Sequence, residues 1–191
     1  MTIFTPEATL GPFYPGVFAL EQMPHDLSRV TPILAHRPQG RPIRVSGRFL
    51  DALGMPVPSL IVEFWQANAH GRYRHPLDQS GRPLDPQFDG FARVRTDDDG
   101  AYTFATIMPG ARGARAPHLR LTIFASGIDR LVTQIFFDEE PLNETDPVLC
   151  AVKDPDVRRR LVAKKTGDAE FTLDIVMRGH NETPFFDDWA R

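Results

Sequence analysis

The chain has 191 residues, with 22 Lys or Arg against 25 Asp or Glu and a formal net charge of −3. This length suits one domain with a real core. The slightly acidic balance gives no reason to expect nucleic acid or an anionic membrane as partner. The first residues lack the pattern of a secretory signal, and no apolar run reaches the ~18 residues of a membrane span. We therefore expect a cytoplasmic protein.

Residues 1–42 show no periodicity and are rich in proline. Such a segment cannot form a core alone, so we expect an extended N-terminal arm that lies on its own domain or on another chain. Aromatic side chains give this arm apolar anchors and favour an interface. They are Phe4, Phe13, Tyr14 and Phe18.

From Ile43 onward, alternating and β-branched segments predict strands. A long irregular loop, 67–89, interrupts them, and loops of this length are often functional. The run Thr96 to Gly100 predicts a tight turn that joins 91–95 and 101–107 as a hairpin. The predicted strands cover 43–49, 60–66, 91–95, 101–107, 118–125, 131–137 and 170–178.

One helix is expected near the C-terminal third of the chain. Asp154 can cap it, Pro155 suits its first position, and Gly167 can end it. Seven or eight strands with one short helix predict an all-β fold, an antiparallel β-sandwich with long loops at one end. In this interpretation the sandwich domain spans 43–191 and follows the 1–42 arm.

The stretch 108–137 carries the candidate chemistry. A loop rich in Pro, Gly and Arg, 109–117, precedes a strand whose side chains alternate between two faces. Leu119, Leu121 and Ile123 share one face, and His118 and Arg120 share the other. His118 and Arg120 are therefore expected to flank one spot at the mouth of the loop.

Three runs in order carry a specific resemblance to a known family. They are WQANAHGRYRH (65–75), FDGFARVRTDDDGAYTFATIMPG (88–110), and PHLRL (117–121) followed by TQIFF (133–137). With these runs the sequence resembles the intradiol ring-cleaving dioxygenases. The resemblance implies a β-sandwich in which two tyrosines and two histidines hold Fe(III). The enzymes it points to cleave a catechol ring with O2 to a muconate.

Only two of the four implied ligands are present. Tyr73 and His118 match the first tyrosine and the first histidine. The second histidine falls on Arg120, whose guanidinium has no lone pair to give. The second tyrosine should follow Pro109-Gly110, but Ala111 and Arg112 stand there. The family's arginine before the H-x-H strand matches Arg115, and no metal is expected in this chain.

This pattern resembles the α-type chain of the two-chain members of the family. The resemblance implies a homologous β chain that holds the Fe(III), and a higher αβ oligomer with the aromatic diol and O2 at a shared site. It also implies that the α arm forms part of the wall of the partner's active site. The wall residues expected here are Thr9, Gly11, Pro12, Phe13, Tyr14 and Gln134. Either Phe13 or Tyr14 faces that pocket.

Other interpretations stay open at this point. Tyr73 could be a loop hydrogen-bonder, and His118 could donate to a backbone carbonyl. Arg120 could form a structural ion pair with Asp129 or Glu63. His70 and His75 have no assigned role or could replace lost ligands. A self-sufficient homomeric dioxygenase using Tyr73, His118, His75 and Tyr14 is one alternative, and a non-catalytic sandwich binding module is another.

Overall fold

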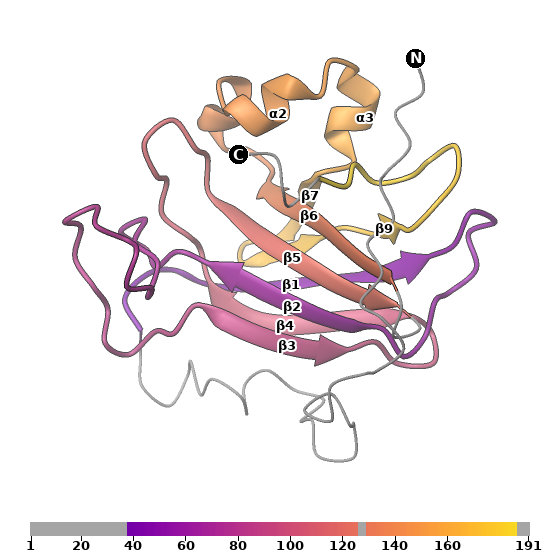
Figure 1. The fold of residues 1–191 in the computed structure, drawn as a ribbon, viewed down its shortest axis with the longest axis horizontal. Helices are drawn as coiled ribbons and strands as arrows, with labels where there is room; N and C mark the ends of the chain where they lie inside the picture. Colours follow the sequence, from indigo (N-terminus) through magenta and orange to yellow (C-terminus); the bar gives the residue numbers. More distant parts are fainter. Residues whose placement is uncertain (1–37, 126–128, 187–191) are drawn as a thin grey trace.

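The computed structural model describes residues 38–125 and 129–186, in which β-strands predominate (Figure 1). The arm residues 1–37, including Thr9, Gly11, Pro12, Phe13 and Tyr14, lie outside the described residues. The six strands predicted between 43 and 137 form, with small changes at their ends, and three more strands follow them. The strands of the described residues are β1 (Pro42–Leu50), β2 (Ile61–Gln66), β3 (Phe91–Arg95), β4 (Ala101–Ile107), β5 (His118–Ala125), β6 (Asp129–Phe137), β7 (Val162–Gly167), β8 (Glu170–Thr172) and β9 (Ile175–Val176).

The strands form a mixed sheet rather than a purely antiparallel one. Its order is β3-β2-β5-β6-β7-β8-β1-β4, and β9 pairs with β1. The parallel pairs are β6 with β7 and β1 with both β8 and β9. A parallel pair requires a crossover connection, and the segment between β6 and β7 supplies one with its short helices.

The tight turn between β3 and β4 forms as predicted, but the hairpin does not. Gly100 N donates to Asp97 O at 3.0 Å, and Gly100 has a φ of +66°, which glycine adopts readily. β3 then pairs with β2, whereas β4 pairs with β1. The sheet folds over so that β3, β2, β5 and β6 form one layer and β8, β1 and β4 form the other. The turn therefore carries the chain from the first layer to the second, and β3 and β4 each pair with a longer strand.

The main core lies between the two layers. Phe64 of β2 packs on Phe104 of β4 with ring centroids 4.2 Å apart, although these strands do not pair. Leu119, Leu121 and Ile123 of β5 are fully buried in this core, as their alternation predicts. His118 and Arg120 therefore point to the other face of the layer.

The helix predicted over 154–167 forms only at its start, and the second half of this segment is a strand. α3 (Pro155–Arg159) begins as expected, with the Asp154 carboxylate accepting from two backbone amides. The chain then enters β7, because Val162 and Ala163 gain backbone partners on β6 and Ala163 is fully buried. The predicted 170–178 strand likewise divides into β8 and β9.

Two further short helices precede α3 and lie with it on one side of the strands (Figure 1). They are the 3-10 helix η3 (Pro141–Glu144) and α2 (Pro147–Ala151). Leu149 of α2 packs with Ala116, Phe136 and Leu161 in a second, smaller core. In the described ranges no helix is long and apolar enough to span a bilayer.

Asp146 joins these helices to the loop before β5. Its carboxylate is fully buried, caps α2 through the Val148 and Leu149 amides, and accepts from Ala116 N at 2.8 Å. The Arg115 guanidinium also donates to this carboxylate, from Nε to Oδ2 at 2.9 Å. Every contact of this carboxylate is thus to a hydrogen-bond donor, as a buried charge requires.

We predict that Asp146→Ala destabilises the chain by about 3–5 kcal/mol, because it removes a cap and leaves Arg115 without its buried partner. The matched control is Asp154→Ala, which removes an exposed cap of the same Asp-Pro type and should cost about 1 kcal/mol. Urea unfolding of both variants measures the difference. Equal losses would show that Asp146 is only a helix cap.

Candidate functional site

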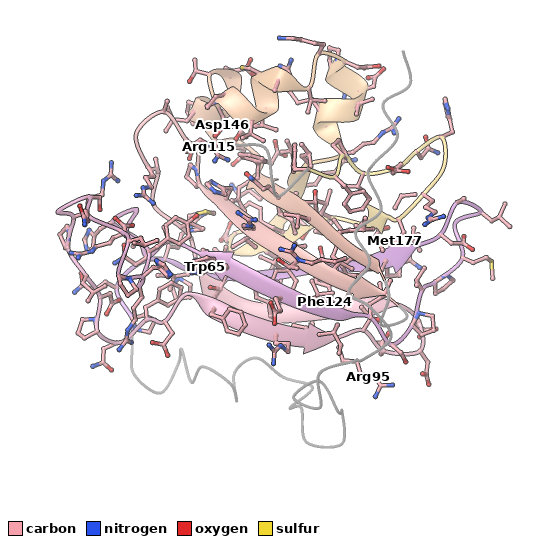
Figure 2. All side chains as sticks on the ribbon, in the orientation of Figure 1. Trp65, Arg95, Arg115, Phe124, Asp146 and Met177 are labelled. Carbon is pink, nitrogen blue, oxygen red and sulfur yellow. The ribbon has the colours of Figure 1, made fainter. Side chains whose placement is uncertain are left out.

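The candidate site is a cavity of about 270 Å³ at one end of the strands. In Figure 2, Trp65, Arg115 and Asp146 lie toward this end, whereas Arg95 and Phe124 lie toward the other. The end of β2, the start of β5 and two loops, 67–90 and 109–117, form its walls. The lining residues are Trp65, Tyr73, His75, Leu77, Asp78, Arg112, Arg115, His118, Arg120 and Gln134.

Tyr73 and His118 are hydrogen-bonded to each other. The distance from Tyr73 Oη to His118 Nε2 is 3.3 Å, and the distance from His118 Nδ1 to Ala116 O is 2.7 Å. A carbonyl can only accept, so the ring carries its proton on Nδ1 and its Nε2 accepts from the tyrosine hydroxyl. These contacts are the ones that the sequence alternatives describe, a loop hydrogen-bonder and a donor to a backbone carbonyl, and the roles of both residues toward a metal stay predictions.

Both members of this pair are held neutral. Burial lowers the pKa of His118 from 6.5 to about 4 against the opposing effect of the Ala116 hydrogen bond, and the charge of Arg115 lowers it further. Burial also raises the pKa of Tyr73, despite the opposing charges of Arg115 and Arg112. At neutral pH the pair is a tyrosine and an imidazole rather than a tyrosinate and an imidazolium.

Arg112 and Arg115 flank a tight turn. Each donates its backbone amide to the other's carbonyl, at 3.0 and 2.9 Å, and Gly113 between them has a φ of +58°. This turn brings both guanidinium groups to the cavity wall. The Arg112 guanidinium also lies over the Tyr73 ring, 5.5 Å from its centroid.

Arg115 is the more firmly held of the two. Besides Asp146, its guanidinium donates to Gln134 Oε1 on β6. Gln134, which the sequence interpretation assigns to the partner's wall, therefore lines the cavity of this chain. Its role toward a partner stays a prediction.

Among the described residues that line the cavity, Asp78 is the one carboxylate. Its side chain is 2% exposed and forms an ion pair with Arg112, Oδ2 to Nη1, at 3.3 Å. Burial alone would raise the pKa of Asp78, but hydrogen bonds from Ser80 and Tyr73 and the charge of Arg112 outweigh it and lower the pKa to about 2. Asp78 is therefore ionised, and its bond to Tyr73 N at 2.8 Å fixes the tyrosine's backbone.

The remaining predicted residues divide between the cavity and its surroundings. Arg120 lines the cavity, but its suggested partner Glu63 bonds instead to Arg93, whose Nε lies 2.9 Å from the carboxylate. The side chain of Asp129, the other suggested partner, is not described. His75 lines the cavity, whereas His70 bonds Gln39 through Nε2 at 2.8 Å and is not among the lining residues.

A backbone hydrogen bond and a close approach join the 67–90 and 109–117 loops. Gly110 N donates to Asn68 O at 2.9 Å, and a Cβ at Gly110 would meet Ala69 O at 2.3 Å. Only glycine permits this approach. Asn68 also accepts from the backbone of His70 and Arg72, so one buried amide side chain shapes the 67–90 loop.

Sequence reasoning missed Asp78, Asp146 and Trp65. Asp146 precedes Pro147 as Asp154 precedes Pro155, so the signal used for α3 was present there too. Trp65 lies on a recognised strand, and its alternation with buried Phe64 could have placed it on the cavity face. Asp78 carries no such signal, because burial of a carboxylate in a loop depends on the folded loop.

The fold and the site define a class of protein. The sequence profile of the family described as Dioxygenase matches residues 11–179. The protocatechuate 3,4-dioxygenase β chain of Burkholderia cepacia is 38% identical over 88% of this chain and 77% of its own length. The corresponding α chain of Pseudomonas putida is 34% identical over 96% of each chain. The chain therefore belongs to the intradiol ring-cleaving dioxygenase family.

Solved structures agree with this fold. The dioxygenase domain of a carbohydrate-binding fusion protein from Streptomyces sp. SirexAA-E is 27% identical, with a TM-score of 0.59, over 92% of this chain and 98% of that one. An intradiol ring-cleavage dioxygenase from Tetranychus urticae is 20% identical, with a TM-score of 0.62, over 94% and 98%. The latter likeness concerns the fold alone.

The family uses non-haem Fe(III), and the donor set of this cavity does not fit that ion. Tyr73 and His118 already bond each other, and guanidinium groups occupy the wall beside them. Guanidinium cannot coordinate a metal. Within 38–125 and 129–186, no group of three or more His, Cys, Asp or Glu is placed to hold a metal ion. Of the four donor positions that the resemblance implies, two are occupied by Arg112 and Arg120, which have no lone pair to give.

The depressed pKa of His118 predicts a loss of stability in acid. Between pH 6.5 and about 4, the unfolded chain binds a proton at this histidine that the folded chain does not. Its contribution is fully present above pH 6.5 and is lost as the pH falls toward 4, by up to about 3 kcal/mol. Asp78 titrates at lower pH, from 3.8 to about 2, and does not interfere.

The measurement is urea unfolding across this pH range for the natural chain, for His118→Gln and for the exposed-histidine control His180→Gln. We expect the slope of unfolding free energy against pH to fall in His118→Gln and to persist in His180→Gln. A slope unchanged in His118→Gln would assign the acid sensitivity to other groups.

Proposed function

We propose that this chain is the α-type subunit of a protocatechuate 3,4-dioxygenase-like enzyme and binds no iron itself. A homologous β-type chain would hold the Fe(III), and the pair would cleave a catechol with O2 to a carboxymuconate. The near end-to-end similarity to the P. putida α chain supports this proposal. The activity in this account belongs to the pair of chains.

The observation that carries the proposal is the charge of the cavity wall. Arg112, Arg115 and Arg120 all line the space beside the neutral Tyr73–His118 pair. One positive charge about 5 Å from a trivalent cation costs on the order of 10 kcal/mol at an effective dielectric constant of about 20. Asp78, which is paired with Arg112, and Asp146, which is paired with Arg115, each offset part of that repulsion.

The contribution of this chain to catalysis would come through its arm and its assembly. In the proposed complex, Thr9, Gly11, Pro12 and Phe13 or Tyr14 line the β chain's pocket and shape it around the aromatic diol. Gln134 would reach the same shared site. An arm rich in proline and aromatic residues pays little entropy on docking, which suits it to this role.

A self-sufficient homomeric dioxygenase is the second candidate. The 38% identity to a β chain favours it, as does the position of His75 on the cavity wall. His75, however, accepts from Leu77 N through Nδ1 at 3.2 Å and packs against Trp65. His75 could therefore coordinate a metal ion only through Nε2 if both of these contacts are to remain.

Co-expression with a β-type chain separates these candidates. We expect the two chains to elute together on size exclusion and the pair to turn over protocatechuate, whereas this chain alone is inactive. The β-type chain expressed alone is the control for its own activity. Failure of the chains to associate, or turnover by this chain alone, would contradict the proposal.

A second prediction concerns the lost ligands. Arg120→His with Arg112→Tyr replaces two cations by two donors beside Tyr73 and His118, and we expect it to raise the bound iron measured by metal analysis. The matched control, Arg120→Gln with Arg112→Gln, removes the same charges and should gain much less iron. Equal iron in both double variants would show that charge, rather than missing donors, limits binding.

A further inference from the structure

We propose that the free edge of β4 pairs with the same edge of a second copy of this chain, so that two sheets join into one. β4 stands at the end of the strand order, and β1 is its one strand partner among the described residues. Figure 1 shows β4 in the lower part of the molecule, on the side away from α2 and α3. The inference goes beyond the proposed function, and no step of it depends on iron or on a β-type chain.

The sequence of β4 lacks the features that protect most edge strands. Natural edges carry charged side chains, prolines or bulges, which discourage pairing with another chain. β4 reads AYTFATI, with no charge and no proline, and its register with β1 runs from Ala101 to Ile107 without a bulge. Near its middle, Thr103 is exposed and Ala105 is half-buried. Both side chains are small, so the backbone of this edge is open to a partner strand.

The hydrogen bonds at the two ends of β4 show which of its backbone groups face outward. Phe49 N donates to Gly100 O at 2.9 Å, and Met108 N donates to Arg41 O at 2.8 Å. In an antiparallel pair, alternate residues bond to the same neighbour, so the even-numbered residues of β4 bond to β1. The odd-numbered residues therefore direct their N–H and C=O groups to the free edge.

The chain itself satisfies outward groups at both ends of this edge. Ala101 N donates to Asp97 Oδ1 at 2.7 Å, and Ala101 O accepts from Asp97 N at 3.2 Å. At the other end, Ile107 O accepts from Gln66 Nε2 at 3.0 Å. What these contacts leave for a partner is the middle of the strand.

The middle of the edge is self-complementary. Among the described residues, none bonds the N–H and C=O groups of Thr103 and Ala105. A two-fold axis can place Thr103 opposite Ala105 of the second copy, and Ala105 opposite its Thr103. Each such pair exchanges two hydrogen bonds, so this register satisfies all four groups on both copies.

The two ends of β4 carry opposite charges, which favours this antiparallel arrangement. Asp97, Asp98 and Asp99 are exposed in the turn before β4, and the exposed Arg41 lies beside its other end. In the proposed pair, the acidic turn of each copy faces the Arg41 end of the other. They are separated by about two strand spacings, ~10 Å, which the side chains can bridge.

An exposed aromatic ring near the edge adds apolar area to the contact. A narrow cleft between β3 and β4 is lined by Phe64, Phe91, Phe104 and Ala105, among others. Phe91 is 40% exposed, whereas Phe64 and Phe104 are buried. A strand on the β4 edge would lie at the mouth of this cleft and remove apolar surface from water.

The test is analytical ultracentrifugation of the purified full chain over a range of concentrations. We expect a monomer–dimer equilibrium that Ala105→Pro weakens roughly tenfold or more, because proline removes an N–H that faces the free edge and not β1. The matched control is Ala52→Pro in the 51–54 turn, where Gly54 N donates to Asp51 O and proline fits. The control should leave the equilibrium unchanged. A monomer at every concentration, or an undiminished dimer of folded Ala105→Pro, would overturn the inference.

A second experiment tests the register with variants that keep every hydrogen bond between β4 and β1. In a Cys150→Ser background, Thr103→Cys and Ala105→Cys are purified separately and mixed under oxidising conditions. The proposed pair places these positions opposite each other with Cα atoms ~5.5 Å apart, which a disulfide spans. We expect a disulfide dimer in the mixture and not in either variant alone. No cross-link in the mixture, or an equal one in a single variant, would contradict the register.

The two proposals fail separately. If this chain stays monomeric alone but turns over protocatechuate together with a β-type chain, the β4 inference falls and the subunit proposal stands. If it dimerises through β4 but no β-type chain associates with it, the β4 inference stands and the subunit proposal falls.

Discussion

The structure of the site depends on one buried ion pair, Arg115 with Asp146. The carboxylate caps α2, holds Ala116 N and fixes the guanidinium before β5 begins. Because the same turn carries Arg112, this pair also places the second arginine on the cavity wall. A burial that is costly for a lone charge becomes tolerable here because every contact of the carboxylate is a donor.

The Arg115–Asp146 pair also determines which charges surround the cavity. The family fold brings a tyrosine from the 67–90 loop to a histidine at the start of β5, and in this chain the two bond each other at 3.3 Å. Burial keeps both neutral, while the surrounding charge is cationic. This arrangement of guanidinium groups beside a neutral pair is the ground for the proposed subunit role without iron.

Much of the fold could be predicted from the sequence, because strand patterns are local. The faces of β5 follow from alternation, and Tyr73, His118, Arg112, Arg115 and Arg120 meet in one cavity as the resemblance implies. Pairing is not local, so the β3–β4 hairpin and the 154–167 helix were wrong: each segment had a better partner far along the chain. The burial of Asp78 likewise depends on contacts that only the folded loop creates.

The most direct test of the central claim is the iron content of the purified full chain, measured together with its visible spectrum. We predict substoichiometric iron and no ferric-tyrosinate absorption, because Tyr73 stays protonated and bonded to His118. Stoichiometric iron with strong visible absorption from a tyrosinate of this chain would contradict it.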